Sequence, residues 1–176
     1  MRRFRYIIIA AIIAADQIVK AVIRGKMQVG DSFSVIDNFF SITYVSNTGG
    51  AMSTFEGNTL LLVCLPIAAI IFAVFYMEKH LSAHITLPAS LTLIVSGGIG
   101  NLVDRIVFGY VTDFLDFTSI PLWNWVFNIA DIAICVGCFL LVLYVLFFDK
   151  PADESDKKTA KESVRTSEKE SAKESE

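Results

Sequence analysis

The chain has 176 residues, of which 54% are hydrophobic, and its formal net charge is −3. This composition is more apolar than that of a typical soluble domain and favours a membrane protein. Residues 1–148 carry nine acidic and eight basic side chains, so this part is nearly neutral, and we expect no nucleic-acid partner.

Four segments are apolar enough to cross a membrane as helices. A hydrocarbon core of about 30 Å requires roughly 20 apolar residues in a helix. Residues 60–77 and 85–103 contain no charged side chain, and residues 125–148 contain only Asp131. We therefore predict an all-α integral membrane protein with four transmembrane helices, at about residues 4–23, 60–77, 86–106 and 126–148.

The N-terminal segment starts with M-R-R-F-R-Y and continues as an apolar run, which is also the pattern of a secretory signal peptide. The apolar helical pattern continues past Ala15 to Ile23, which is long enough to span a membrane. We therefore expect a retained first helix. Asp16 and Lys20 interrupt its apolar character.

Residues 27–58 form the longest segment between predicted spans. Residues 33–36 and 39–45 are rich in β-branched and aromatic side chains, and Asp37 and Asn38 between them are typical of a turn. We predict a small antiparallel sheet on the outer membrane surface, between the first and second spans.

The basic residues near the span ends indicate the orientation. Arg2, Arg3 and Arg5 precede the first span, and Lys79 follows the second. The connecting loop at residues 109–125 has no Lys or Arg. By the positive-inside rule, both termini are expected in the cytoplasm and this loop outside.

Residues 149–176 carry nine acidic and seven basic side chains and almost no apolar ones. Such a segment cannot bury enough apolar surface to fold alone. We expect a disordered, charged cytoplasmic tail, to which we assign no role, after a membrane domain of residues 1–148.

Polar side chains of three predicted spans fall near the outer ends of the helices. A helix rises about 1.5 Å per residue, which places Asn128 and Asp131 roughly 5–10 Å below the outer boundary. The residues at this level are Asp16, Lys20, Asn101, Asp104, Arg105, Asp113, Asn128 and Asp131. Ionisable groups at such depth usually face inward and have a function, so we expect a shared site.

Several of these acids have a structural interpretation. Asp16 and Lys20 are four residues apart and favour an ion pair on one helix face. The charge of Asp104 is expected to be neutralised by the adjacent Arg105, or its side chain to cap the end of the helix. We interpret Asp116 as a solvated acid next to the membrane interface.

Asp131 has no basic residue within four positions on its own helix, so it needs a partner from elsewhere in the chain or a raised pKa, and we favour a functional role. Two carboxylates in a poorly hydrated site tend to share a proton, so that one activates water while the other hydrogen-bonds a carbonyl. The only histidines, His80 and His84, lie in the predicted cytoplasmic loop, and we expect neither a metal nor a cofactor. Residue spacing alone does not decide whether Asp113 has a structural or a catalytic role.

Five short sequence blocks occur in order along the spans. They are D-Q-I-V-K at 16–20, N-T-G-G-A at 47–51, G-N-L-V-D-R at 100–105, G-Y-V-T-D-F-L-D-F at 109–117 and F-N-I-A-D at 127–131. Together they resemble the lipoprotein signal peptidases (signal peptidase II), a family of bacterial membrane aspartyl proteases. The resemblance covers residues 4 to about 148.

The resemblance implies that Asp113 and Asp131 are catalytic and activate water. The expected reaction is hydrolysis before a diacylglyceryl-modified cysteine, which releases the signal peptide of a prolipoprotein. The resemblance also implies substrate-binding or supporting roles for Asp16, Lys20, Asn47, Gly49, Asn101, Asp104, Arg105, Asn128 and Ala130. The outer β segment resembles the family's substrate cradle, and the family is the target of the antibiotic globomycin.

Further expectations concern the partners, the oligomeric state and the location. The partners are a lipidated prolipoprotein and membrane lipid, the protein is a monomer, and it lies in the bacterial cytoplasmic membrane with its site near the extracytoplasmic face. The family commonly has N-x-G-A-A and an aromatic residue in the outer loop, where this chain has Gly50 and Met52. We expect substrate contacts in that loop to differ.

Two other classes of protein remain as alternatives. An ion-coupled transporter also carries carboxylates in its spans, but it predicts charges near the bilayer midplane and access from both sides. A membrane scaffold with buried polar contacts predicts that Asp113 and Asp131 tolerate replacement by Asn.

Overall fold

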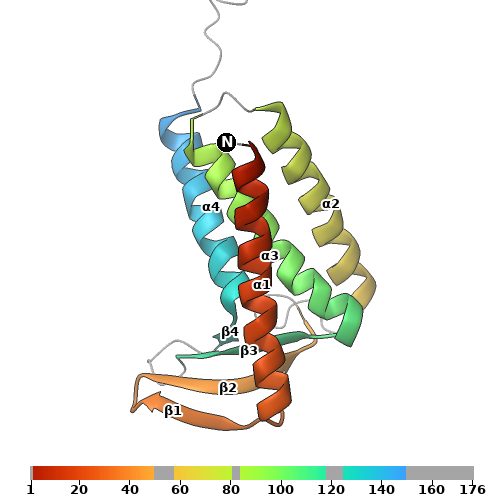
Figure 1. The fold of residues 1–176 in the computed structure, drawn as a ribbon, viewed down its shortest axis with the longest axis vertical. Coiled ribbons are helices and arrows are strands. Elements are labelled where there is room, and N and C mark those ends of the chain that lie inside the picture. Colours follow the sequence, from red (N-terminus) through yellow and green to blue (C-terminus); the bar gives the residue numbers. More distant parts are fainter. Residues whose placement is uncertain (1, 50–57, 81–83, 118–124, 150–176) are drawn as a thin grey trace, which may run out of the picture.

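The computed structural model describes residues 2–49, 58–80, 84–117 and 125–149. Within these ranges, four helices stand side by side and a small sheet lies across one end of them (Figure 1). The elements in chain order are α1 (Arg2–Lys26), β1 (Ser32–Ile36), β2 (Phe40–Asn47), α2 (Thr59–Lys79), α3 (Thr86–Phe108), β3 (Val111–Asp116), β4 (Val126–Phe127) and α4 (Ile129–Phe147).

All four helices are long and apolar enough to cross a membrane. Many of their large apolar side chains point outward, among them Leu65, Phe72 and Phe139. That arrangement suits helices whose outer faces contact lipid. α1 begins and α4 ends at the end of the molecule opposite the sheet (Figure 1). The prediction of four apolar helices is confirmed.

The sheet is antiparallel and has the strand order β1-β2-β3-β4. Strands β1 and β2 lie where the sequence predicts them, and Asn38 in the turn has a φ of 57°, which Asn tolerates better than most residues. The prediction of a sheet made only between the first two spans is incomplete, because β3 and β4 come from residues that follow α3. Asp113 lies in β3, opposite Val45 of β2, and not in a loop.

Strand β3 escapes prediction for a physical reason. Aspartate is depleted in strands, and V-T-D-F-L-D contains two of them. Asp113, Phe114 and Asp116 are all buried, so the segment also lacks the alternation of buried and exposed residues found in a surface strand.

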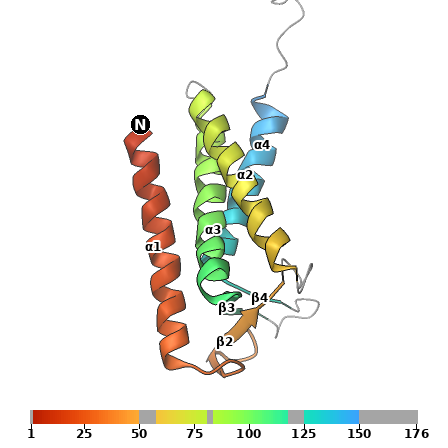
Figure 2. The same ribbon diagram turned by 90° about the vertical axis from the view of Figure 1, so that its right-hand side faces the viewer.

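Helix α3 occupies the centre and contacts the other three helices (Figure 2). Small residues allow the close approach of α4. A side chain at Gly97 would collide with the carbonyl oxygen of Ala130, and one at Gly137 would lie 2.8 Å from the carbonyl oxygen of Ser90. Close backbone approach at small residues is typical of helices that pack in membranes.

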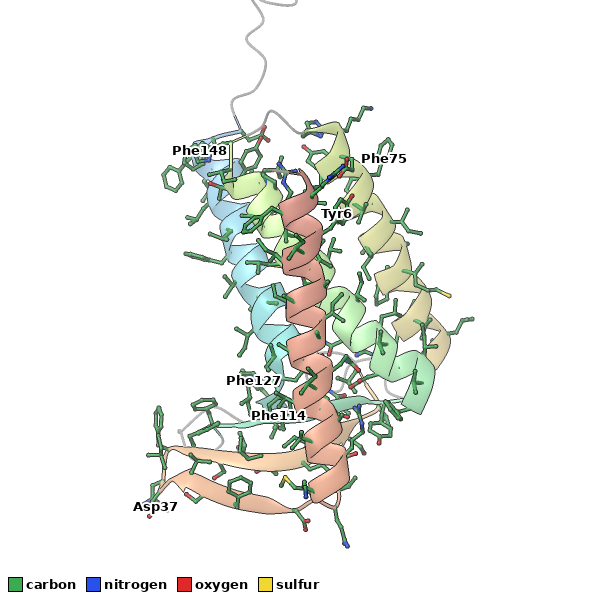
Figure 3. All side chains as sticks on the ribbon, in the orientation of Figure 1. Tyr6, Asp37, Phe75, Phe114, Phe127 and Phe148 are labelled. Atoms are coloured by element: carbon green, nitrogen blue, oxygen red, sulfur yellow. The ribbon has the colours of Figure 1, made fainter. Side chains whose placement is uncertain are left out.

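A small apolar cluster attaches the sheet to the helices. Ile23 of α1 packs against Tyr44 of β2 and Phe114 of β3, and all three are buried. Phe114 and Phe127 lie where the sheet meets the helices, whereas Tyr6 and Phe148 lie at the opposite end (Figure 3). The cluster fixes β3, and therefore Asp113, relative to α1.

Candidate active site

A buried ionic cluster joins α1 to α3 near the sheet. Lys20 Nζ lies 2.9 Å from Asp16 Oδ2 and 3.3 Å from Asp104 Oδ2, and all three side chains are at most 1% exposed. Arg24 Nη1 lies 3.4 Å from Asp104 Oδ1. Two cations thus balance two carboxylates, which is the condition for keeping such charges out of water.

Asp16 extends this cluster to α4. Its Oδ1 accepts a hydrogen bond from the backbone N–H of Ala130 at 3.0 Å, at the start of α4 where backbone N–H groups are free. The carboxylate passes Gly100 of α3, where an added Cβ would lie 2.9 Å from Asp16 Oδ2 and 3.2 Å from Ala130 Cβ. A glycine at position 100 therefore allows α1, α3 and α4 to meet.

Asp104 holds the start of β3. Its Oδ2 accepts a hydrogen bond from the backbone N–H of Thr112 at 2.9 Å. The expected neutralisation by Arg105 is wrong, because adjacent residues on a helix point in directions about 100° apart. Arg105 instead donates from Nη2 to the carbonyl oxygen of Gly49 at 3.0 Å.

Two side chains of α1 that the sequence analysis did not single out take part. Arg24 Nη1 donates to Thr112 Oγ1 at 2.8 Å, and its guanidinium lies 4.2 Å from the centre of the Phe108 ring. Gln17 Nε2 donates to the carbonyl oxygen of Gly100 at 3.0 Å and to Asp104 Oδ1 at 3.2 Å. The signal for Arg24 was its spacing, since residues 16, 20 and 24 share one helix face.

Asp113 is 2% exposed and is held by two amides. Asn128 Nδ2 donates to its Oδ1 at 2.6 Å, and Asn47 Nδ2 donates to its Oδ2 at 2.9 Å. Asn47 is itself oriented, because its Oδ1 accepts the backbone N–H of Gly49 at 3.0 Å. The carboxylate of Asp113 therefore has a fixed direction.

Asp131 lies in the first turn of α4 and is held by different donors. Asn101 Nδ2 donates to its Oδ1 at 2.7 Å, and the backbone N–H of Asn128 donates to its Oδ2 at 3.1 Å. Asn128 Oδ1 accepts in return from the backbone N–H of Asp131 at 3.0 Å, which completes a capping box. This distant amide of Asn101 is the partner that the sequence required for Asp131.

Asn128 and Asn101 connect the two acids to the ionic cluster. Asn128 Nδ2 also donates to Asn101 Oδ1 at 3.1 Å, and Lys20 Nζ donates to that same oxygen at 2.9 Å. One continuous hydrogen-bond network thus runs from Lys20 to Asp113 and Asp131.

The two acids open on one cavity of about 690 Å³. Its polar wall carries Asn47, Asn101, Arg105, Asp113 and Asp131. Its apolar wall comes from α2, α3, β4 and α4 and includes Pro66, Gly98, Val126, Phe127, Ile132, Ile134, Cys135 and Val136. The cavity therefore joins a carboxylate pair to an apolar surface that continues along the helices.

The surroundings of Asp113 favour its protonated form. Burial, followed by the negative charge of Asp131, raises the pKa of Asp113 from 3.8 to about 7, although hydrogen bonds from Asn47 and Asn128 act in the opposite direction. At neutral pH this carboxyl group therefore exchanges readily between acid and base, as a proton-transfer group requires.

Four of the other expected site residues lie behind the cavity wall. Asp16, Lys20, Asp104 and Ala130 are buried in the supporting network. Asp116 is not a solvated acid: it is 9% exposed, and Thr43 Oγ1 donates to its Oδ2 at 2.5 Å. Its place opposite Ser41 of β2 explains that burial.

Further expectations concern the outer loop, the C-terminal tail and metal binding. The altered loop positions 50 and 52 and the tail from residue 150 lie outside the described residues. Over the described ranges, no three His, Cys, Asp or Glu side chains are grouped as metal ligands.

Comparison with known proteins places this geometry in context. A family model described as signal peptidase (SPase) II matches residues 8–147. The lipoprotein signal peptidase of Halothermothrix orenii is 39% identical over 149 residues, which are 84% of this chain and 99% of that protein. The lipoprotein signal peptidase of Clostridioides difficile is 36% identical over 143 residues, or 81% and 95% of the two chains.

Solved structures are similar as well. A bacterial membrane enzyme structure obtained by the in meso method at 2.3 Å resolution has a TM-score of 0.77 and 28% identity, and the match covers 85% of this chain and 94% of that one. A second structure of the same description, at 1.9 Å resolution, has a TM-score of 0.72 and 29% identity over 84% and 94% of the chains.

Proposed function

The chain belongs to the signal peptidase II family, and we propose that it is an intramembrane aspartic endopeptidase that removes signal peptides from prolipoproteins. The bond hydrolysed is the one before a diacylglyceryl-modified cysteine. Its four helices and its family make the chain a multi-pass protein of the bacterial inner membrane. The observation that supports the aspartic mechanism is that Asn128 binds Asp113 and Asp131 on the wall of one cavity.

The proposed reaction uses one proton shared by the two acids. The ionised carboxylate takes a proton from a water molecule, whose oxygen attacks the carbonyl carbon of the scissile peptide bond. The protonated carboxyl group gives its proton to the carbonyl oxygen. We assign this proton to Asp113, whose pKa burial raises to about 7.

The second step returns both acids to their starting state. The carbon–nitrogen bond breaks, the carbonyl re-forms, and the departing amine of the cysteine receives a proton from the acid that had deprotonated the water. The second hydroxyl proton of the tetrahedral intermediate returns to the other acid. The products are a peptide with a new C-terminal carboxylic acid, which then ionises in water, and the free amine of the cysteine, and no metal or cofactor takes part in this proposed reaction.

The shape of the cavity supports a lipidated substrate. Asn47 and Arg105 provide hydrogen-bond donors beside the acids, where a peptide backbone is to bind. Pro66, Ile132 and Val136 provide an apolar wall along the membrane-crossing helices, where acyl chains of the diacylglyceryl group are to lie. The sheet is then the cradle that holds the extracytoplasmic part of the substrate.

The proposed orientation places both chain ends in the cytoplasm and the sheet outside. The basic residues before α1 and after α2 support it, because Lys and Arg gather on the cytoplasmic side. The two acids lie at the sheet end, which favours a hydrolase at one membrane face over a transporter with a path through the midplane. We also propose that the protein works as a monomer.

The test is cleavage of a defined prolipoprotein by the purified protein in detergent, with the products identified by mass spectrometry. The expected product begins with the diacylglyceryl-modified cysteine, and the same precursor without the lipid is not cut. Cleavage at another bond, or equal cleavage of the precursor without the lipid, would contradict the proposal. Proteoliposome flux without cleavage would favour the transporter.

A further inference from the structure

A second cavity lies between α1 and α3, at the end of the molecule away from the sheet. Its volume is about 610 Å³. The residues that line it are Phe4, Arg5, Ile8, Ile85, Pro88, Ala89, Thr92 and Leu93. We call this cavity the α1–α3 groove.

The groove is apolar except at Arg5 and Thr92. The Thr92 hydroxyl is already used, because it donates to the carbonyl oxygen of Pro88 at 2.6 Å. Arg5 is the one charged residue of the lining. A ligand that fills this groove therefore needs a long apolar part and an anionic group at the level of Arg5.

Arg5 has an unused donor. Its Nη1 is buried and has no hydrogen-bond partner within the described part of the chain. A carboxylate at the same end, that of Glu78, accepts the hydroxyl of Tyr6 at 2.8 Å. A buried donor without a partner is unfavourable, and a charged one more so, so a bound anion would relieve this cost.

We propose that the α1–α3 groove binds one anionic glycerophospholipid, with its phosphate on the Arg5 guanidinium and an acyl chain against Ile8, Ala89 and Leu93. The guanidinium fork matches the geometry of phosphate oxygens. The position also fits, because Arg5 lies near the start of a helix that is long and apolar enough to cross a membrane, where a lipid phosphate is expected. In the proposed orientation this lipid belongs to the cytoplasmic leaflet.

The bound lipid has a structural task. The buried residues of α1 include Ile9, Asp16, Lys20 and Ile23, whereas its first turns are mostly exposed. A lipid in the groove fills the space between those turns and α3. It therefore stabilises the position of the helix that carries Asp16 and Lys20.

The experiment measures lipid binding to the purified full chain in detergent, by native mass spectrometry and by thermal unfolding. The added lipids are phosphatidylglycerol and, with the same acyl chains, zwitterionic phosphatidylcholine. We expect phosphatidylglycerol to bind with one preferred site and to raise Tm, with a smaller effect of phosphatidylcholine.

Two arginine variants separate the site from general charge attraction. Arg5→Gln is expected to weaken the preferred phosphatidylglycerol binding roughly tenfold or more and to remove the Tm increase. Arg3→Gln removes the same charge from an exposed side chain two residues away and is expected to bind like the parent. Equal binding by Arg5→Gln, or equal losses in both variants, would overturn the proposal.

A third variant tests the apolar part. Ala89→Phe fills the groove and keeps Arg5, so we expect it to lose the preferred lipid site while still folding. Unchanged binding in Ala89→Phe would contradict a lipid seated in the groove. An equal Tm increase with inorganic phosphate would show that an anion suffices, and would also overturn the proposal.

Discussion

Asn128 donates from Nδ2 to Oδ1 of Asp113 at 2.6 Å, so a residue at the start of α4 orients an acid of β3. The same residue binds Asp131 through its backbone N–H at 3.1 Å. One asparagine thus sets the relative position of two carboxylates that lie in different elements. The residue that caps α4 is therefore also the residue that positions the two candidate catalytic acids.

Replacing Asn128 by Ala tests this positioning role. We expect cleavage to fall roughly ten- to a hundredfold, because the hydrogen bond that orients Asp113 is lost. The pKa of Asp113 should rise further, since the hydrogen bond from Asn128 lowers it. A plot of cleavage rate against pH should show its Asp113-dependent limb moved to higher pH.

The matched control is Asn58→Ala. Asn58 caps α2, where its Oδ1 accepts the backbone N–H of Leu61 at 3.2 Å, far in sequence from either acid. Both variants lose a cap worth about 1 kcal/mol. If Asn58→Ala lowered cleavage as much and moved the pH profile equally, the effect of Asn128 would be one of stability alone.

The raised pKa of Asp113 predicts how stability depends on pH. Between pH 4 and 7 the folded state binds more protons than the unfolded state, because folding raises the pKa of Asp113 from 3.8 to about 7. The free energy of unfolding therefore falls as pH rises through this window and levels off above it. Asp113→Asn removes this dependence and should be more stable than the parent at pH 7 by up to about 4 kcal/mol, with no advantage at pH 4.

Thermal unfolding of both proteins across this pH range checks the prediction. Asp37→Asn makes the same change at an exposed side chain in the β1–β2 turn, and its curve should follow that of the parent. If the thermal stability of Asp113→Asn and that of the parent changed with pH in parallel, folding would not raise the pKa of Asp113.

Arg24 should be needed to hold β3 in place. Arg24→Lys keeps the charge but loses the guanidinium that reaches Thr112 Oγ1 and stacks over Phe108. We expect a loss of about 1–2 kcal/mol in the free energy of unfolding and a severalfold slower cleavage. Lys26→Gln, at an exposed side chain two residues later, should change neither quantity. If Arg24→Lys were as stable and as active as the parent, the Arg24 guanidinium would not be needed to hold β3 in place.

Gly100 should tolerate no side chain. In Gly100→Ala the new Cβ would lie 2.9 Å from Asp16 Oδ2 and 3.2 Å from Ala130 Cβ, so α1 or α4 must move. We expect destabilisation by about 1–3 kcal/mol and slower cleavage. Gly25→Ala meets nothing within 4 Å and should be neutral or slightly stabilising. A Gly100→Ala protein as stable as Gly25→Ala would contradict the close approach of the three helices.

Local sequence patterns could predict some parts of this fold. Long apolar runs identify helices without further information, and the β-branched residues around Asp37 and Asn38 identify β1 and β2. Depth along the helices also places Asn101 and Asp131 at one level. These features depend only on residues that are close in sequence.

Other parts depend on which distant elements meet. The pairing of β2 with β3 joins Val45 to Asp113 across two helices, and no local pattern encodes it. Adjacency in the sequence suggests Arg105 as the partner of Asp104. Its partners in the structure, Lys20 and Arg24, lie on another helix. Charge balance requires a partner for a buried acid but does not identify it, and the packing around Gly100 decides that choice.

The most direct test of the account is the rate of cleavage of a lipidated prolipoprotein by Asp113→Asn and Asp131→Asn. Asp116→Asn is the control, because it makes the same change in β3 at a side chain that binds Thr43 and does not line the cavity. We predict that each of the first two variants, folded as judged by thermal unfolding, cleaves roughly 10²–10⁴-fold more slowly than the parent, and that Asp116→Asn stays within about tenfold. Cleavage at the parental rate by either Asp113→Asn or Asp131→Asn would contradict the proposed dyad.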